Sequence, residues 1–152
     1  MNIRKNKGIS MISLVVTVIL LLIISGISIT GTIQDQKQAE ANTQKTELTM
    51  MQNAILQRYT KAQLTKETLP GTTIEKTEVQ SIIDEINTKS GESITLKGTE
   101  YKQLEKTDLE KLGITGKEDI YIVNYKTGEV INKTQKVTKT GLALYTYAKN
   151  EE

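Results

Sequence analysis

The fold depends on one stretch, ISMISLVVTVILLLIISGISITGTI, which covers residues 9–33 and contains no charged residue. As a helix that rises about 1.5 Å per residue, this stretch reaches roughly 37 Å, more than the ~30 Å hydrocarbon core of a bilayer requires. Its Ser and Thr hydroxyls can donate hydrogen bonds to their own helix backbone, so they are tolerable in lipid. The sequence therefore predicts a transmembrane helix over residues 9–33.

A short basic leader, residues 1–8, precedes this stretch. It contains Arg4, Lys5 and Lys7, and positive charge stays on the cytoplasmic side of a membrane. We therefore expect a single-pass protein of the cell membrane with a cytoplasmic N-terminus and an extracellular C-terminal part. Without these three residues, 17 basic residues stand against 18 acidic ones, so the basic excess belongs to the leader. The exported part gives no electrostatic reason to expect nucleic-acid binding.

The amino-acid composition excludes several kinds of chemistry. The chain has no Cys and no His, so it lacks disulfides, thiolate nucleophiles, the usual proton shuttle and the commonest transition-metal ligand. Catalysis would then need a carboxylate dyad or a Ser–Lys pair, and no motif places either in a recognisable pocket. We therefore expect no enzyme activity, no cofactor and no metal ion.

Three interpretations compete for residues 9–33. The first is a permanent signal anchor that tethers an extracellular domain, which would bind a partner or a cell-wall component. The second is a secretory signal peptide cut within the small residues SGIS, 25–28. This interpretation is the weaker of the two, because the apolar run begins abruptly after Gly8 and exceeds the usual length of such a region. The third is a leader that is removed at the start of the apolar run.

The third interpretation rests on the junction KGISMISL, residues 7–14, which resembles the prepilin cleavage site of type IV pilins and type II secretion pseudopilins. In that family a membrane-embedded prepilin peptidase cuts after the Gly that ends the leader and methylates the new N-terminus. The resemblance implies cleavage between Gly8 and Ile9 and N-methylation of Ile9. It also implies that the subunits leave the bilayer and assemble into a helical filament for adhesion, motility, secretion or DNA uptake.

Ser13 departs from the family's pattern. The fifth residue after the cut is usually Glu, which is thought to neutralise the free amine of a neighbouring subunit, and Ser13 cannot form that ion pair. Some minor pseudopilins lack this Glu, and so do many pilin-like proteins of Gram-positive anaerobes. The resemblance therefore implies a minor or pseudopilin-like subunit of Gram-positive type, rather than a major pilin.

Residues 34–67 are mostly good helix formers, without Pro or Gly. Leu48, Met51, Ile55, Tyr59 and Ala62 recur at spacings of three and four, which predicts one apolar stripe along a helix. We therefore expect an amphipathic extension of the transmembrane helix. The alternative is a separate amphipathic helix after a flexible neck, because residues 34–45 are polar nearly all round.

Residues 68–152 predict an extracellular α+β part. Capping-box signatures at Thr77 and Thr107 start two short helices. The loop 126–128 with Gly128 predicts a hairpin between strands 120–125 and 129–132, and it also looks like a hairpin of Gram-positive pseudopilin-like proteins. Further strands are expected over residues 94–96 and 142–147. The expected architecture is one long helix packed on an antiparallel sheet of three to five strands, which resembles a pilin.

Several polar patterns in this part have ordinary explanations. Asn132-Lys133-Thr134 matches a glycosylation sequon, which is common by chance. Lys133, Lys136 and Lys139 form a spaced basic run that indicates a solvated edge rather than a DNA-binding groove. The acidic groups show no calcium-loop spacing and are expected on solvated faces or helix N-termini. They are Asp84 with Glu85, Asp108 with Glu110, and Glu118 with Asp119.

Overall fold

The computed structural model describes the backbone of residues 6–146 and the side chains of residues 14–21 and 36–146. The chain divides into two units, Met1–Ala39 and Glu40–Glu152, and each is described by itself. The first helix, α1 (Asn6–Thr65), begins in the first unit and ends in the second. Its backbone is helical throughout the expected transmembrane segment and throughout residues 34–65.

The expected membrane span is described only in part. Side chains are described for residues 14–21, which are all exposed, and the rest of the span lies outside the described side chains. Across the described part of the chain, no helical stretch combines the length and the apolar character that crossing a bilayer requires.

In the second unit, the predicted apolar stripe of α1 faces the interior. Leu48, Met51 and Ile55 are at most 3 % exposed, Ala62 is buried and Tyr59 is half-buried. The helix ends at Thr65 because Lys66 adopts a left-handed conformation with φ 58°, and the Lys66 N–H donates to the Ala62 carbonyl at 2.8 Å. The helix therefore stops ahead of Pro70, slightly earlier than the expected limit at residue 67.

Five short strands form one sheet in the order β1-β2-β3-β4-β5, and every neighbouring pair is antiparallel. The expected α+β class with an antiparallel sheet is therefore confirmed. The strands are β1 (Thr72–Ile74), β2 (Tyr101–Leu104), β3 (Tyr121–Val123), β4 (Val130–Asn132) and β5 (Tyr145–Thr146).

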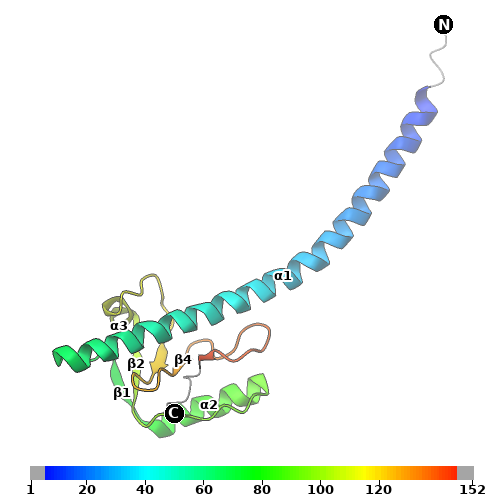
Figure 1. Cartoon of the computed structure of the whole chain (residues 1–152). Coiled ribbons are helices and arrows are strands. Elements are labelled where there is room, and N and C mark those ends of the chain that lie inside the picture. The colour runs from blue at the N-terminus through cyan, green and yellow to red at the C-terminus, as the bar shows by residue number, and fades with distance from the viewer. Residues whose placement is uncertain (1–5, 147–152) are drawn as a thin grey trace. The chain divides into compact units, whose positions relative to one another are not determined.

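Both faces of the sheet are covered, because α1 packs on one and α2 (Lys76–Ser90) packs on the other (Figure 1). Strand residues point alternately to the two faces. Tyr121 and Val123 join the core under α1, while Ile122 between them joins the core under α2. Because both faces of the sheet are covered, β3 is apolar at successive positions and not only at alternate ones. The prediction of a covered central strand is confirmed.

The hairpin of β3 and β4 follows its prediction closely. Ile122 pairs with Ile131, and the connecting turn contains Gly128 at φ 76°, a conformation that glycine adopts without strain. The Asn124 N–H donates to the Glu129 carbonyl, and the Gly128 N–H donates to the Asn124 carbonyl, both at 2.9 Å. Local turn chemistry therefore sets the register of these two strands.

One strand prediction is wrong, and another is confirmed only in part. Residues 94–96 form no strand, because the side-chain amide of Asn87 binds the backbone that a neighbouring strand would bind. Asn87 Nδ2 donates to the Ile94 carbonyl at 2.9 Å, and the Ile94 N–H donates to Asn87 Oδ1 at 2.8 Å. Of the strand expected over 142–147, residues 145–146 form β5 and Ala143 forms an isolated bridge with Val137, while residue 147 lies outside the described residues.

The two short helices are present, but their predicted caps are wrong. The N-cap of α2 is Glu75, not Thr77, and its buried face consists of Val79, Ile82, Ile83 and Ile86 as expected. The N-cap of α3 (Lys106–Lys111) is Glu105, not Thr107, and the Glu105 N–H donates to Asp108 Oδ2 at 3.3 Å. Each helix starts just before its Thr signature, after an N-cap residue with extended backbone, and in α2 the Glu75 side chain forms no capping hydrogen bond.

Candidate functional site

The residues predicted for leader removal lie at the start of α1. Gly8, Ile9 and Ser13 have helical backbone, and their side chains lie outside the described residues, as does the leader up to residue 5. The nearest described side chains are those of residues 14–21. Leu14 is 66 % exposed and Leu21 is 58 % exposed, so this part of the helix presents apolar side chains.

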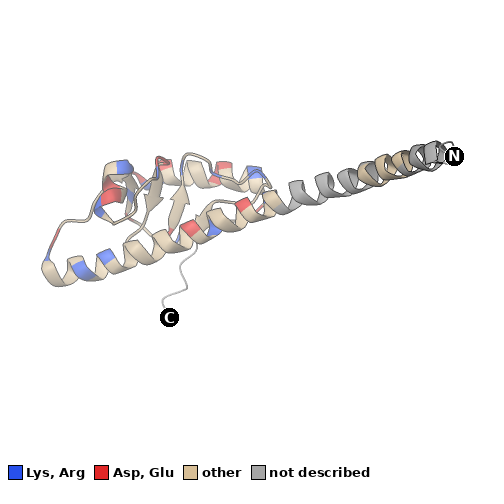
Figure 2. Ribbon diagram, turned by 90° about the horizontal axis from the view of Figure 1, so that it is seen from above, with Lys and Arg blue, Asp and Glu red and all other residues tan. Residues whose placement is uncertain are grey.

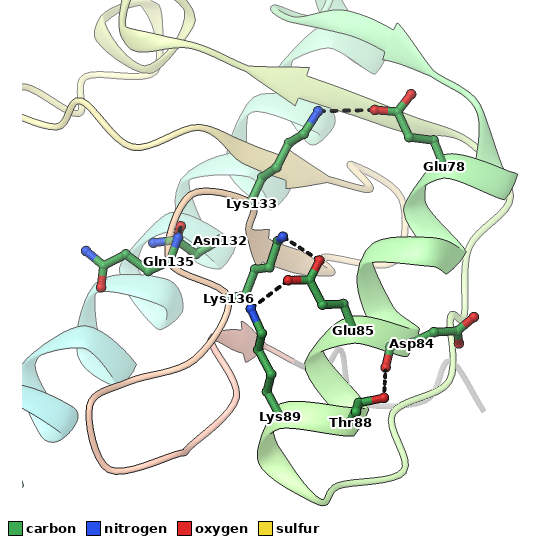
Figure 3. Close-up of polar contacts among 9 residues, drawn as sticks. All are labelled: Glu78, Asp84, Glu85, Thr88, Lys89, Asn132, Lys133, Gln135 and Lys136. Carbon is green, nitrogen blue, oxygen red and sulfur yellow. Dashed lines mark hydrogen bonds and ion pairs between the residues drawn. The ribbon is translucent and has the colours of Figure 1, made fainter.

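In the second unit, acidic and basic residues are interspersed over the elements that surround the sheet (Figure 2). The predicted basic run lies among acidic residues of α2 and α1, and each of its lysines forms an ion pair. Figure 3 shows the pairs of Lys133 and Lys136. These contacts pair residues 133–139 with acidic residues of the helices, so each positive charge of the run has a negative charge nearby. Lys133 Nζ lies 3.1 Å from Glu78 Oε1, Lys136 pairs with Glu85, and Lys139 Nζ lies 3.5 Å from Glu40 Oε2.

The ion pair of Glu85 makes part of the stability depend on pH. Lys136 first and Lys89 second lower the pKa of Glu85 from 4.5 to about 2. A carboxyl with a depressed folded pKa contributes stability above its unfolded pKa and loses it as the pH falls through the folded pKa. We expect Glu85→Gln to be less stable than wild type at neutral pH, and the difference to vanish between about pH 4.5 and pH 2.

Urea unfolding of both proteins across this pH range measures the effect. Lys136→Gln should reproduce most of this loss of stability. Lys76→Gln should not, although Lys76 lies at the start of α2, the helix that contains Glu85. A difference that stayed constant down to pH 2 would show that Glu85 acts through packing rather than through its charge.

Five of the six acidic residues in the groups found in the sequence accept side-chain hydrogen bonds from nearby donors. Asp84 Oδ1 accepts from Gln80 Nε2 at 2.9 Å, and Asp119 Oδ2 accepts from Asn132 Nδ2 at 2.9 Å. Within the part of the chain whose side chains are described, no three acidic residues gather as metal ligands. Asn132 lies in β4 and is only 4 % exposed, so the asparagine of the sequon is buried in the folded protein.

Sequence reasoning missed Glu129, the buried acidic residue among the described side chains. Its exposure is 0 %, although it follows an exposed-looking turn in the sequence. Five donors converge on its carboxylate, and together they form what we name the Glu129 network. Oε1 accepts from Lys97 N at 2.7 Å and Tyr145 Oη at 3.0 Å; Oε2 accepts from Gly98 N at 2.9 Å, Tyr101 Oη at 3.0 Å and Thr127 Oγ1 at 2.7 Å.

The Glu129 network joins segments that are distant in the sequence. It attaches the loop before β2 and the last strand to the β3–β4 hairpin, and it satisfies a buried charge with hydrogen bonds. Burial first, and then the negative charge of Glu129, raise the pKa of Tyr101 above the ordinary range for tyrosine. Tyr101 therefore remains a neutral donor to this carboxylate. The one signal in the sequence that Glu129 could be buried was its position directly before the apolar strand residues Val130 and Ile131.

A cavity of about 420 Å³ lies beside this network, at the β3–β4 turn. Gly98 and Asn124 form part of its wall and approach closely, because a Cβ on Gly98 would lie 1.8 Å from Asn124 Nδ2. Only glycine therefore fits at position 98. Lys97, Lys102 and Lys126 also line the cavity.

Comparison with known proteins adds no relative. The chain matches no protein-family model, no curated protein and no solved structure.

Proposed function

We propose that this protein is a structural subunit, minor or pseudopilin-like, of a type IV pilus or a related secretion or DNA-uptake filament. In this proposal, residues 9–33 insert into the membrane, a prepilin peptidase cuts between Gly8 and Ile9, and Ile9 is methylated. The mature subunit then joins other pilin subunits through its apolar helix. The globular part is carried outside the cell, and no enzyme activity is involved.

The contrast between two parts of one helix carries the proposal. Around Ile55, α1 buries its apolar stripe against an antiparallel sheet, whereas at residues 14–21 it exposes every side chain. Exposed apolar side chains of this size each gain about 1.5–3 kcal/mol when they are removed from water. A bilayer before assembly and a bundle of like helices after assembly would both supply that burial.

A filament is the type of assembly that this proposal implies. Neighbouring subunits that repeat head-to-tail without closing into a ring produce a filament. Ser13 provides no carboxylate for the ion pair that is usual in the family, so apolar contact would drive the assembly of these helices. This favours a minor position in the filament over the role of its main repeating subunit.

Coexpression of the full chain with a prepilin peptidase tests the proposal. We expect mass spectrometry to find a chain that starts at a methylated Ile9. Gly8→Val should remain uncut, because a larger side chain at the scissile bond blocks the close approach of the peptidase to the backbone. Gly31→Val, the same substitution within the apolar run, should be processed like wild type.

Other N-termini would contradict the proposal. A start near Ile29 would indicate a conventional signal peptide. An intact Met1 in the membrane fraction would indicate a permanent anchor that presents a binding domain, the second candidate function. The cavity beside the Glu129 network is the observation that favours this second candidate, because its volume of about 420 Å³ is within the usual range for a small-ligand site.

A further inference from the structure

We infer that the cavity at the β3–β4 turn binds a small organic phosphate, with the phosphate group held by Asn124 Nδ2 and the surrounding lysines. This inference concerns the folded second unit alone, so it does not depend on leader removal or on filament assembly. Its volume of about 420 Å³ lies within the usual range for small-molecule sites.

Asn124 supplies the first argument. The residue is only 3 % exposed, and its Oδ1 accepts hydrogen bonds from the N–H groups of Lys126 and Thr127, both at 2.9 Å. These two bonds identify the other side-chain atom as the amide nitrogen. No described residue accepts a hydrogen bond from Nδ2, although the side chain lines the cavity. Nδ2 is therefore a donor that faces the cavity and has no protein acceptor, and a ligand oxygen in the cavity could accept its hydrogen bond in place of water.

The charge of the cavity wall supplies the second argument. Lys97, Lys102 and Lys126 come from the loop before β2, from β2 and from the turn after β3, and a single acidic residue, Glu100, joins them. Lys102 Nζ donates to the carbonyls of Leu69 and Gly71 at the long distances of 3.3 and 3.4 Å. An ammonium has three N–H donors, so one remains for a ligand. Glu129 lies behind Gly98 and Thr127, where five donors already satisfy its carboxylate. Three lysines against Glu100 and Glu129 still leave the surroundings of the cavity net positive and rich in donors, which favours an anion.

The geometry of these donors favours phosphate over carboxylate. The lining has no arginine, whose planar fork matches a planar carboxylate. Compact ammonium groups on separate elements instead suit the oxygens of a tetrahedral phosphate, which point in different directions. Tyr59 and Leu69 form an apolar part of the same wall, which would contact the organic body of a phosphate ester.

Titration calorimetry of the full chain in an uncharged detergent tests this inference, with phenyl phosphate as the probe and inorganic phosphate in a second arm. We expect saturable binding of phenyl phosphate at one site. The double variant Lys97→Gln/Lys126→Gln should weaken it by about tenfold or more, because two charge-assisted contacts are lost. The matched exposed pair Lys76→Gln/Lys106→Gln should leave the affinity unchanged. Circular dichroism checks that each variant is folded.

Asn124→Asp provides an independent probe, because it keeps the oxygen that binds the turn and replaces the free donor with a negative charge. We expect it to abolish binding. Weaker binding of inorganic phosphate than of phenyl phosphate would support the contact with the organic body. The inference is overturned if no saturable binding occurs, if inorganic phosphate binds as tightly as the ester, or if the control pair weakens binding as much as the cavity pair.

Discussion

Replacing Glu129 with glutamine is expected to lower the free energy of unfolding of the second unit by about 2–4 kcal/mol. The substitution conserves shape, but it exchanges one acceptor oxygen for an amide that can only donate. If the amide NH2 takes the place of Oε1, it faces the Lys97 N–H; if it takes the place of Oε2, it faces the Gly98 N–H. In both cases a backbone donor loses its acceptor. Each buried donor that loses its acceptor costs about 1–3 kcal/mol, and the hydroxyl contacts also lose their charged partner.

The tyrosines give a selective measurement of this loss. All six lie at residue 59 or beyond, so near-ultraviolet circular dichroism during urea unfolding reports on the second unit without a contribution from the helix at residues 9–33. Glu110→Gln is the matched control, because Glu110 is an exposed residue of α3. Its effect should stay within about 0.5 kcal/mol. Equal stability of Glu129→Gln and wild type would mean that water replaces the missing acceptor.

Truncation of Ile55 to alanine is expected to destabilise the same unit by about 2–5 kcal/mol. Ile55 is 0 % exposed and lies in α1 at the centre of the core shared with Val123 and Val130. Its loss removes apolar contacts and leaves a cavity that rigid neighbours on the sheet cannot fill.

Leu64→Ala is the matched control on the same helix. Leu64 is 81 % exposed, so its truncation should change the free energy of unfolding by less than about 0.5 kcal/mol. The same urea titration measures both variants. Similar effects of the two truncations would show that α1 is not anchored to the sheet through Ile55. A large effect of Ile55→Ala alone would show that the apolar stripe holds the helix in place.

Predictions from the sequence succeeded where the deciding interactions are local. The stripe of α1 follows from apolar residues that repeat every three or four positions, and the β3–β4 hairpin follows from a turn with Gly128 where positive φ is needed. The buried face of α2 is periodic for the same reason. In each case the residues that determine the structure lie within a few positions of one another.

Predictions failed where a distant or unexpected partner decides. β1 and β2 were missed because Thr72–Ile74 and Tyr101–Leu104 are short and mixed in character, and only their pairing with each other and with β3 makes them strands. Residues 94–96 have good strand character, yet the Asn87 side chain occupies the backbone groups of Ile94. β-propensity therefore counts only when a partner strand is available.

The candidate sites divide in the same way. Gly8, Ile9 and Ser13 form a continuous motif, so the proposal of leader removal comes from the sequence alone. The role of Glu129 could not be predicted from the sequence, because its partners Lys97, Gly98 and Tyr101 lie 32, 31 and 28 residues away. The same tertiary contacts place Asn124 against Gly98 and so create the cavity wall.

By itself, the sequence determined the uncharged run 9–33, the basic leader, the periodic stripe of α1 and the hairpin turn, because length, charge and local period are properties of neighbouring residues. The tertiary structure alone decided the order of the five strands, the burial of Glu129 and the cavity lined by Asn124 and three lysines. The physical reason is that the energetic effect of a buried charge or amide depends on the groups that surround it. Those groups come together only when the α1 stripe and α2 close over the two faces of the sheet.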